Sequence, residues 1–564
     1  MTDPGSARRP LPYVTPQTEF YWASGADGKL RVQRCQDCDR LIHPPKPVCP
    51  RCRGHRIEIR EVSGYATLIG FTENHRFPFP GLPMPYVVGQ VVLEEDPAVR
   101  LTTTVVGADA GDLVLGMRMR AEFQQADDVW LPVFRPAPGQ PASGELPADL
   151  PEDEIGPEQV RAAIRPPVSA RKFEDDVALT GIGASRIGRR LMADPLALTV
   201  EACEAAVADA GLTMDDIDGL STYPGFSPAG GMGEGGVTAL EAALRLRPVW
   251  YNGGAETFGP GGSVIAAMLA VSAGLARHVL CFRTVWQATH DELVKQGRLR
   301  GGGLGAGGRI TGDMAWTVPF GATSAAHVLA QHAQRHMHRY GTTRETLGWI
   351  ALNQRANAAL NPAAIYRSPM TMDDYLGARM ITTPFGLYDC DVPCDAAIAV
   401  IVSAADAARD LPRPPVFVEA VGTQIAENVE WDQSTSTHEP QVFGPSAHMW
   451  TRTALRPGDV DVALLYDGFT FNCLSWLEAL GFCGIGEAKD FLDGGKNIAR
   501  DGVLPLNTHG GQLSHGRTHG MGLLHEAVVQ LRGSGGDRQI PGARVAVVTS
   551  GGLTPSGVLL LRNS

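Results

Sequence analysis

Four cysteines near the N-terminus are spaced so that they could hold a metal ion. Cys35 and Cys38 form one Cys-x2-Cys pair, and Cys49 and Cys52 form a second. Each pair presents two thiolates to one point, and two pairs supply the four ligands of a closed, tetrahedral zinc site. Because a closed site leaves no position for a substrate, we expect a structural zinc ion. Iron in the same cage, or an empty site, are the alternatives.

The other six cysteines are scattered along the chain: Cys203, Cys281, Cys390, Cys394, Cys473 and Cys483. Cys390 and Cys394 flank a proline and could form a redox or metal pair, whereas Cys281 lies in an apolar run that predicts a buried strand. The N-terminal residues lack the apolar core of a signal peptide. A long chain without such a signal is expected to keep its thiols reduced. We therefore expect a cytoplasmic protein whose clustered cysteines bind metal rather than form disulfides.

The composition is that of a globular protein with more than one domain. The chain has 564 residues, and single cores stop growing at about 250–300 residues. The net charge of −12 disfavours a nucleic-acid-binding surface, although a local basic pocket for a phosphorylated ligand remains compatible with it. No segment approaches the run of about 18 apolar residues that a membrane span requires.

The sequence changes character at several points, which predict the domain boundaries. Residues 1–34 predict an arm that docks elsewhere, and residues 35–60 carry the cysteine pairs of a zinc ribbon. Short alternating runs broken by Gly, Pro and Asp in residues 61–135 are typical of a small barrel such as an OB fold. The proline-rich residues 136–174 predict a semi-extended linker. Residues 175–564 form the largest unit.

Alternating strands and helices in this largest unit predict an α/β fold. A buried strand is expected at Val177-Ala-Leu-Thr-Gly-Ile-Gly, followed by a helix with apolar residues from Leu196 to Val207. The segment that begins at Ser263 is nearly uncharged, so this helix belongs in the interior, and it leads into a strand at Val279. The glycine-rich run 301–308 lacks the Lys-Ser/Thr of a phosphate-binding loop, and we expect it to form a lid or loop over the substrate site.

The double Cys-x2-Cys, the following segment Gly64-Tyr-Ala-Thr-Leu-Ile-Gly-Phe and the glycine-containing barrel strands are similar to a known module. They resemble the zinc-ribbon/OB partner proteins that accompany acyl-CoA thiolases and related enzymes in bacterial degradation pathways. In that family the module usually forms a separate chain that contributes to assembly of the neighbouring enzyme. The resemblance implies that the module is fused to its enzyme in this protein.

The largest unit carries an ordered set of motifs: Val177-Ala-Leu-Thr-Gly-Ile-Gly, Gly188-Arg-Arg, Ala210-Gly-Leu-Thr, Asp216-Ile-Asp-Gly-Leu, Leu387-Tyr-Asp-Cys-Asp-Val-Pro-Cys-Asp-Ala-Ala, Tyr466-Asp-Gly-Phe, Pro505-Leu-Asn-Thr-His-Gly-Gly, Gly516-Arg-Thr-His-Gly and Ser550-Gly-Gly. This set resembles the thiolase superfamily, closest to its sterol-carrier/lipid-transfer thiolase-like branch. The resemblance implies the α/β thiolase fold, with two repeated βαβαβαββ halves in five layers. By fold analogy it implies a homodimer formed through the region of the buried helix. It also implies that Cys390 and Cys394 are structural thiols and not a redox or metal pair.

The cysteine nucleophiles of thiolases are missing from the positions where the resemblance would place them. The slot before the buried helix holds Thr257 or a neighbour, and the C-terminal glycine loop around Ser550 has no cysteine. The Gly-His-Pro loop of thiolases reads Gly516-Arg-Thr. Because serine or threonine cannot replace a thiolate without a strong base, we do not expect covalent Claisen or thiolytic chemistry.

The resemblance also suggests proton-transfer groups. In thiolase-like aldolases of steroid side-chain degradation, tyrosines take over at the active site, and Tyr466 falls on one of these positions. The second position falls in the loop Gly516–Gly520, where this chain has Arg517 and no tyrosine. Arg517 would lower the pKa of Tyr466 or bind a thioester oxygen. We expect Tyr466 to move a proton with assistance from His519. The alternatives are that Tyr466 only packs in the core, that His519 caps backbone groups and that Arg517 is a surface charge. Further candidate histidines are His509 and His515.

These groups suit a retro-aldol cleavage of a β-hydroxyacyl-CoA, which needs a base, oxyanion donors and an acid but no cysteine. Glycine lets the main chain approach a ligand closely, so we expect N–H donors from Gly510, Gly511, Gly551 and Gly552. The hypothesis is an acyl-CoA carbon–carbon lyase that splits a bulky, polycyclic or branched substrate into a ketone or aldehyde and a short acyl-CoA. The alternatives are a thiolase or acyltransferase with a nonstandard nucleophile, and a non-catalytic acyl-CoA-binding scaffold.

Overall fold

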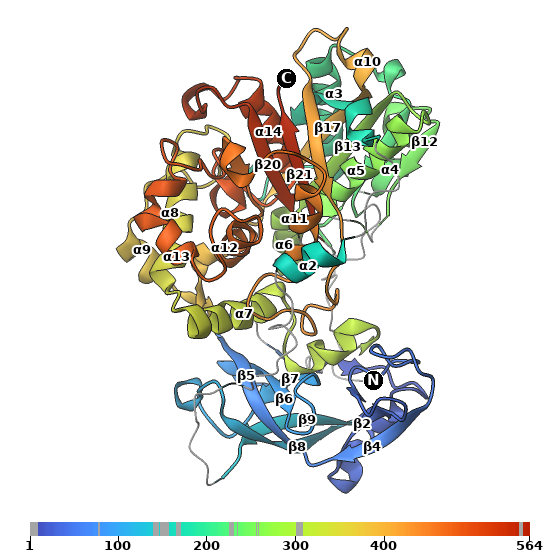
Figure 1. Ribbon diagram of the computed structural model, residues 1–564, viewed down its shortest axis with the longest axis vertical. Coiled ribbons are helices and arrows are strands. Elements are labelled where there is room, and N and C mark those ends of the chain that lie inside the picture. The colour runs from blue at the N-terminus through green and yellow to red at the C-terminus, as the bar shows by residue number, and fades with distance from the viewer. Residues whose placement is uncertain are drawn as a thin grey trace.

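The computed structural model describes residues 9–76, 79–138, 146, 157–164, 171–224, 230–233, 235–254, 257, 259–299, 308–551 and 556–564. Gly552, the predicted lid at 301–307 and most of the predicted linker lie outside these ranges. No helix within them is both long and apolar enough to cross a membrane. Figure 1 shows a smaller unit built from the N-terminal strands and a larger α/β unit above it.

The smaller unit begins with a three-stranded antiparallel sheet in the order β3-β2-β4. Strand β2 (Leu30–Cys35) pairs along its length with β4 (Ile57–Val62), while β3 (Leu41–Ile42) covers its other edge. Helix α1 (Glu19–Trp22) buries two aromatic rings before this sheet starts. The last residues of the predicted arm, 30–34, thus form most of ribbon strand β2. The described residues before them pack against other parts of the chain.

A closed barrel follows the ribbon and confirms the predicted OB-type fold. Five strands pair in the order β5-β6-β7-β9-β8, and an additional pairing of β5 with β8 closes the barrel. Small residues allow the tight curvature: a Cβ at Gly89 would lie 2.7 Å from a methyl carbon of Val105. The strands are β5 (Tyr65–Asn74), β6 (Tyr86–Leu93), β7 (Arg100–Val105), β8 (Arg118–Ala126) and β9 (Val129–Pro136).

The larger unit is built on a nine-stranded sheet whose halves repeat one strand order. The first half runs β10-β17-β13-β11, with β12 at the edge, and the second runs β18-β21-β20-β19. In each half the first three strands are antiparallel and the fourth is parallel to the third. This repetition agrees with the predicted thiolase fold. The strands are β10 (Val177–Ala184), β11 (Gly219–Thr222), β12 (Trp250–Asn252), β13 (His278–Trp286), β17 (Asp395–Ala404), β18 (Val416–Gly422), β19 (Val462–Leu464), β20 (Val545–Ser550) and β21 (Gly557–Arg562).

Two helices occupy equivalent places in these halves. Helix α5 (Gly259–Ser272) precedes β13 and α14 (Met521–Leu531) precedes β20, and each helix contacts strands of both halves. Val264 and Met268 of α5 are fully buried, as its lack of charge predicts. Leu269 is 50% exposed, so one side of this interior helix is open.

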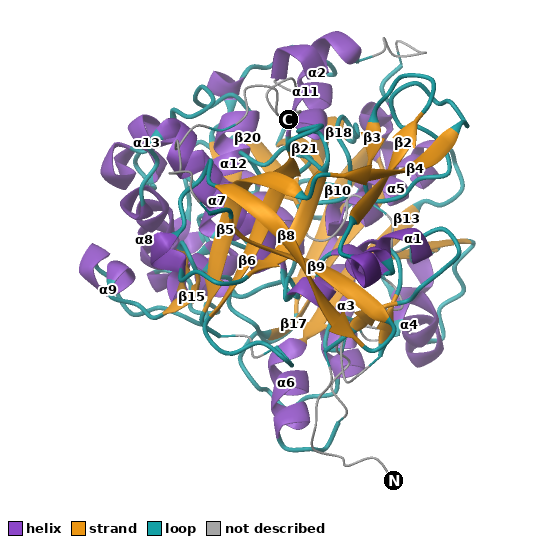
Figure 2. Ribbon diagram, turned by 90° about the horizontal axis from the view of Figure 1, so that it is seen from below, coloured by secondary structure: helices purple, strands orange, loops and turns teal. Residues whose placement is uncertain are grey.

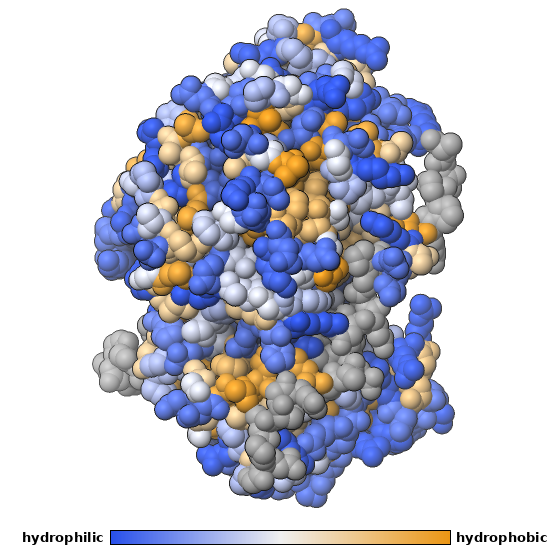
Figure 3. All heavy atoms as spheres, turned by 60° about the vertical axis from the view of Figure 1, so that its left-hand side comes forward, coloured by the Kyte–Doolittle hydropathy of each residue, from blue (hydrophilic) through white to orange (hydrophobic). Residues whose placement is uncertain are grey.

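The remaining helices pack on and around this sheet. Helix α3 begins with Pro195 behind the capping carboxylate of Asp194 and packs on β10, β17 and β13. Figure 3 shows that polar side chains cover much of the face on the α8 and α12 side. These helices are α2 (Pro157–Ala163), α3 (Pro195–Ala210), α4 (Gly236–Leu244), α6 (Gln287–Lys295), α7 (Ala325–Tyr340), α8 (Arg344–Ala359), α9 (Met372–Leu376), α10 (Ala405–Ala408), α11 (Phe443–Trp450), α12 (Thr470–Ala479) and α13 (Ala488–Phe491).

The two units share hydrogen bonds along a continuous interface. Strand β15 (Met380–Thr382), itself paired with β16 (Phe385–Gly386), extends the barrel sheet beside β5. At the N-terminus, β1 (Leu11–Pro12) pairs in parallel with β14 (Arg309–Ile310). Helix α7 lies between the units in Figure 1, and Figure 2 shows the barrel strands from below with helices of the larger unit around them.

The residues between β18 and α11, numbers 423–442, form a connecting segment that touches both units. Asp432 accepts hydrogen bonds from two barrel residues: its carbonyl oxygen from Gln90 (2.6 Å) and its carboxylate from Thr102 (3.0 Å). Lys46 of the ribbon forms an ion pair with Glu430 at 2.6 Å. The zinc-ribbon/barrel unit therefore positions a segment that continues into the interior of the α/β unit.

Candidate active site and zinc ribbon

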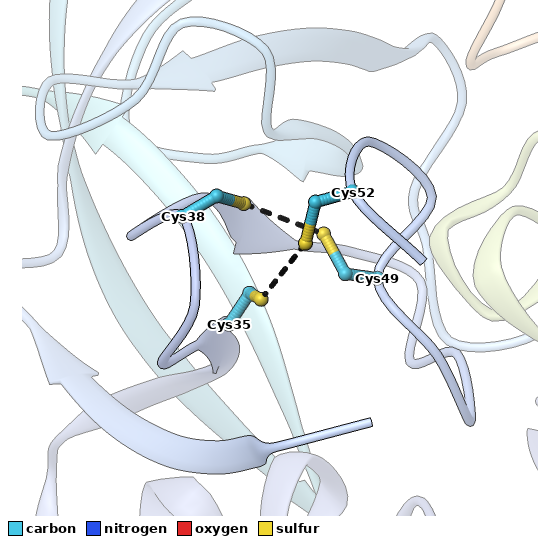
Figure 4. A group of neighbouring side chains, drawn as sticks. All are labelled: Cys35, Cys38, Cys49 and Cys52. Carbon is cyan, nitrogen blue, oxygen red and sulfur yellow. Dashed lines mark hydrogen bonds between the residues drawn. The ribbon is translucent and has the colours of Figure 1, made fainter. Parts of the chain in front are cut away.

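The four N-terminal cysteines converge as the sequence predicts. Cys35 ends β2 and Cys38 follows in a tight turn, while Cys49 and Cys52 come from the facing turn (Figure 4). Both turns bring a backbone N–H to the carbonyl oxygen of their first cysteine, at 2.9 Å in each case. All four sulfur atoms lie within 4.8 Å of one another.

The sulfur positions fit a zinc ion. Cys35 and Cys52 have an Sγ–Sγ distance of 3.5 Å, and Cys38 and Cys49 one of 3.6 Å. A tetrahedron with Zn–S bonds of about 2.3 Å has edges of about 3.8 Å. Four thiolates fill the coordination shell, so the ion holds the two turns together and offers no open position for chemistry.

Tyr466 lies in the interior of the α/β unit, just beyond the end of β19. The side chain of Asn507 fixes this end, because it accepts a hydrogen bond from the Leu465 N–H (2.8 Å) and donates one to the Leu465 carbonyl (2.9 Å). The Tyr466 N–H donates to the Thr549 hydroxyl at the end of β20. Parallel strands β19 and β20 thus bring their carboxyl ends to one place, where ligands bind in many α/β folds.

Two glycines make room for the Tyr466 ring. A Cβ at Gly468 would lie 2.9 Å from Tyr466 Cε1, and a Cβ at Gly551 would lie 3.0 Å from Cδ1. A Cβ at Gly551 would also approach Glu439 Oε1 to 2.9 Å. Gly551 was predicted as an oxyanion donor, and the structure places it between the tyrosine ring and a buried carboxylate.

Burial keeps Tyr466 protonated. It raises the pKa of the phenol above its ordinary value, the nearby carboxylates of Asp391 and Glu439 raise it further, and Arg517 lowers it by less. Arg517 lowers the pKa of Tyr466 in the direction that the sequence suggested, but desolvation outweighs this single positive charge. A neutral phenol of this kind is a proton donor.

Arg517 lies in the site, paired with a carboxylate. Its Nη1 is 3.4 Å from Asp391 Oδ1, and the two side chains are 19% and 10% exposed. Burial raises the pKa of Asp391 to about 6, and the guanidinium of Arg517 opposes that rise. At neutral pH the carboxylate is ionised and the pair offers both a base and a cationic hydrogen-bond donor.

His519 faces the same region and is held by an arginine from the other half of the sheet. Arg283 on β13 donates a hydrogen bond from Nη2 to His519 Nδ1 at 2.5 Å. Burial, and then the charges of Arg283 and Arg517, keep the pKa of His519 well below its usual value. A neutral imidazole that accepts at Nδ1 carries its proton on Nε2, so His519 is a hydrogen-bond donor rather than a base. Its left-handed backbone (φ 54°) is costly for a histidine and is typical of functional positions.

His509 and His515 belong to a different cluster. Their rings are 4.9 Å apart, and Glu526 and Arg538 are among the charges that influence the pKa of His515. Burial lowers the pKa of His509 to about 3. No contact between these two histidines and Tyr466 is found in the described part of the chain, so the structure does not bring them into the tyrosine site.

Gly510 and Gly511, which were predicted as oxyanion donors, make close contacts within the chain. The Gly510 N–H already donates to the Asn507 carbonyl at 2.8 Å, so it is not available as an oxyanion donor. A Cβ at Gly511 would lie 1.9 Å from Asp467 Oδ2. Asp467 Oδ1 accepts the Gln512 N–H at 2.8 Å, and this glycine allows the carboxyl to reach it.

The cysteines near the site are poor nucleophiles. Cys394 donates to the Arg517 carbonyl at 3.3 Å, and burial raises the pKa of its thiol to about 12. Burial likewise raises the pKa of Cys390 and of Cys473 on α12 far above the ordinary value. Because only thiolates attack carbonyl carbon, these residues are structural thiols.

The sequence interpretation missed Asp391, Glu439 and Arg283. Asp391 lies between Cys390 and Cys394. It pairs with Arg517, which is more than a hundred residues away in the sequence. Glu439 is buried in the connecting segment, and burial raises its pKa to about 8. Arg283 is an arginine inside a mostly apolar, buried strand, which is a signal that could have been used.

A thiolase-like α/β unit without a cysteine nucleophile, joined to a zinc ribbon and an OB barrel, defines the class of protein. Family models agree: a thiolase C-terminal domain-like model matches residues 428–561. Models described as the ChsH2 rubredoxin-like zinc ribbon and the ChsH2 C-terminal OB-fold domain match residues 22–58 and 59–124.

Individual proteins are similar over nearly their whole length. A steroid side-chain-cleaving aldolase of Thermomonospora curvata is 36% identical over 390 residues, covering 68% of this chain and 97% of that protein. A 17-hydroxy-3-oxo-4-pregnene-20-carboxyl-CoA lyase of Mycobacterium tuberculosis is 35% identical, covering 68% and 98%. The solved structure of an Ltp2-ChsH2(DUF35) aldolase superposes with a TM-score of 0.60 at 32% identity, covering 69% of this chain and 98% of that one. The chain belongs to this family of thiolase-like, side-chain-cleaving aldolases.

Proposed function

We propose that this protein cleaves a carbon–carbon bond in a β-hydroxyacyl-CoA by a retro-aldol reaction, releasing a ketone or aldehyde and a short acyl-CoA. The observation that supports it is the convergence of Tyr466, His519 and the Arg517–Asp391 pair in a site whose thiols are held protonated. The names of the relatives, a steroid side-chain-cleaving aldolase and a carboxyl-CoA lyase, favour a bulky, polycyclic acyl group.

The residues divide the reaction between them. The Asp391 carboxylate takes the proton of the β-hydroxyl; the C–O bond becomes a carbonyl as the Cα–Cβ bond breaks, and its electron pair forms the thioester enolate. His519 Nε2–H and Arg517 donate to the enolate oxygen. Tyr466 then protonates Cα and recovers a proton from Asp391, whose charge acts on the phenol. One proton moves from oxygen to carbon, and no co-reactant is required.

The protonation states suit this sequence. An enolate carbon is a much stronger base than a phenolate, so a tyrosine with a raised pKa still protonates it readily. A neutral His519 donates a hydrogen bond without transferring its proton early. Glu439 lies on the far side of Gly551 from Tyr466, and burial raises its pKa to about 8, so it is largely protonated at neutral pH.

The ribbon and barrel position the connecting segment that carries Glu439. Ribbon Lys46 and barrel residues Gln90 and Thr102 hold this segment at Glu430 and Asp432. We assign the fused module an assembly role at the site and no chemistry of its own. We also assign the enzyme to the cytoplasm, where its free cysteines stay reduced.

A homodimer through edge strand β12 fits the exposed apolar residues of this region. Val249 and Tyr251 are 73% and 69% exposed, and Leu269 and Leu275 at α5 are 50% and 56% exposed. Strand β12 has a free edge in the described sheet, and such edges with apolar side chains favour pairing with another strand. Light scattering should give a dimer that Tyr251→Asp makes monomeric, while Val503→Asp, equally exposed elsewhere, leaves it intact. A monomeric wild type would contradict this assignment.

A thioester panel tests the reaction. The protein is incubated with β-hydroxyacyl-CoAs that range from short, linear acyl groups to polycyclic ones, and the products are separated by liquid chromatography with mass detection. We expect equal amounts of ketone or aldehyde and shortened acyl-CoA, formed fastest from the bulky substrates. Tight binding of the whole panel without turnover would favour a non-catalytic acyl-CoA carrier.

A further inference from the structure

Besides the four-cysteine site, one other cluster in the described ranges brings at least three metal-binding side chains together. It consists of His336 on α7, His438 in the connecting segment and Glu478 on α12. All three side chains are 0–1% exposed. Glu478 Oε2 lies 2.7 Å from His438 Nε2 and 3.2 Å from His336 Nε2, so the three potential ligand atoms face one point.

The outer atoms of the cluster are already oriented by hydrogen bonds. His336 Nδ1 is 2.9 Å from the Thr342 hydroxyl, and His438 Nδ1 is 3.1 Å from the Thr437 hydroxyl. The second carboxylate oxygen of Glu478 accepts an N–H at 3.1 Å. When each Nδ1–H donates to its threonine, both Nε2 lone pairs point at the carboxylate oxygen. Such second-layer hydrogen bonds are what orient histidine and carboxylate ligands around metal ions.

We propose that His336, His438 and Glu478 bind a second structural metal ion, a divalent transition metal of which zinc is the best match. Two imidazole nitrogens and one carboxylate oxygen are ligands that zinc accepts. Without a cation, both imidazoles would have to take the other tautomer, with Nε2–H donating to the one carboxylate oxygen and the threonine hydroxyls donating to Nδ1. A divalent cation satisfies all three groups at once.

The surroundings indicate structure rather than catalysis. The ring of Tyr340 lies 4.7 Å from that of His336, Phe471 lies 5.7 Å from it, and Phe443 lies 4.9 Å from that of His438. These rings pack against the two histidines and separate the cluster from the proposed active site. Tyr466, the proposed proton donor, is not in this aromatic group.

The ion would join the elements that connect the barrel to the proposed active site. Helix α7 also accepts the Phe71 N–H of the barrel through Gln334 (2.9 Å). The connecting segment contacts the barrel at Asp432, contributes His438, and places the next residue, Glu439, beside Gly551 and the Tyr466 ring. A metal at this junction would fix the later part of the segment, between its barrel contact at Asp432 and Glu439 beside the Tyr466 ring.

Metal content of the full-length protein tests the site. Protein made in zinc-containing medium and dialysed against metal-free buffer without chelator should carry two zinc ions per chain by plasma mass spectrometry. Glu478→Gln and Cys38→Ser should each lower this to one. His332→Asn, which changes a buried histidine of the same helix outside the cluster, should keep both. A wild type with one zinc, which Cys38→Ser abolishes and Glu478→Gln retains, would overturn the proposal and leave a hydrogen-bonded His–Glu–His cluster.

A spectroscopic measurement avoids dependence on folding of the variants. Wild-type protein loaded with Co²⁺ should show thiolate-to-metal charge-transfer bands from the cysteine site. It should also show a second set of ligand-field bands, without charge transfer, from a nitrogen/oxygen site. Titration that saturates with the thiolate spectrum alone would contradict the second site. This outcome is independent of the lyase reaction, because neither measurement requires turnover.

Discussion

Replacement of Tyr466 by phenylalanine is the most informative change in the proposed active site. The ring fills a slot between Gly468 and Gly551 and is 5% exposed, so Tyr466→Phe keeps the packing and removes a single oxygen atom. We expect the free energy of unfolding to change by less than about 1 kcal/mol, the net worth of one hydrogen bond.

The effect on turnover should be much larger. A positioned general acid contributes about 10²–10⁴-fold, which is about 3–5 kcal/mol of transition-state stabilisation. His519 and Arg517 would still hold the enolate oxygen, so we place the loss near the middle of this range, at about 10³-fold. Because the phenol acts in the transition state, kcat and kcat/KM should fall together while KM changes little.

The assay follows release of the shortened acyl-CoA under steady-state conditions, with thermal unfolding as the control for folding. Tyr86→Phe is the matched variant: Tyr86 is also 5% exposed, and its hydroxyl donates to the Gly321 carbonyl at 3.1 Å in the barrel region. It should lose about 1 kcal/mol of stability and keep full activity. Wild-type kcat in Tyr466→Phe would refute the role of the phenol as proton donor.

Three further changes test other parts of the site. Burial raises the pKa of Asp467 from 3.8 to about 7. The folded state therefore binds this proton more tightly, and stability is lost as pH rises through that range, by up to about 4 kcal/mol. Asp467→Asn should flatten the melting temperature between about pH 4 and pH 7, and an unchanged pH dependence would exclude this carboxyl as the cause. Arg283→Lys should lower kcat about tenfold to a hundredfold, since lysine lacks the fork that bonds both Met232 and His519, and an active variant would argue against His519 as donor. Cys38→Ser should release the ribbon zinc and make residues 30–62 protease-sensitive; resistance equal to wild type would contradict a structural zinc.

Local spacing made the zinc ribbon and the overall fold predictable. Two Cys-x2-Cys pairs carry their ligand geometry in the sequence, because each pair spans one turn. The buried strand at Val177 and the uncharged helix at Ser263 were equally clear, since a segment without charges must lie in the interior. These became β10 and α5.

The active site was only partly predictable, because its members come from distant elements. Tyr466 and His519 were found through family motifs, but the charges that decide their protonation were not. Arg283 reaches His519 across 236 residues, and Asp391 meets Arg517 across the α/β unit. Desolvation, which sets the pKa of Tyr466, depends on the packing of the whole unit and has no local signature. For the same reason the histidines His336 and His438 gave no sign of a shared site.

We propose that the carbon–carbon bond is cleaved with no covalent link between the substrate and the enzyme. This proposal is tested most directly by mixing enzyme with a polycyclic β-hydroxyacyl-CoA, quenching in acid during the first turnovers, and measuring the intact protein mass and the products together. We expect ketone and shortened acyl-CoA in equal amounts, and a protein mass that is unchanged at every quench time. An acyl group attached to the chain, on a cysteine, serine or threonine, would contradict it.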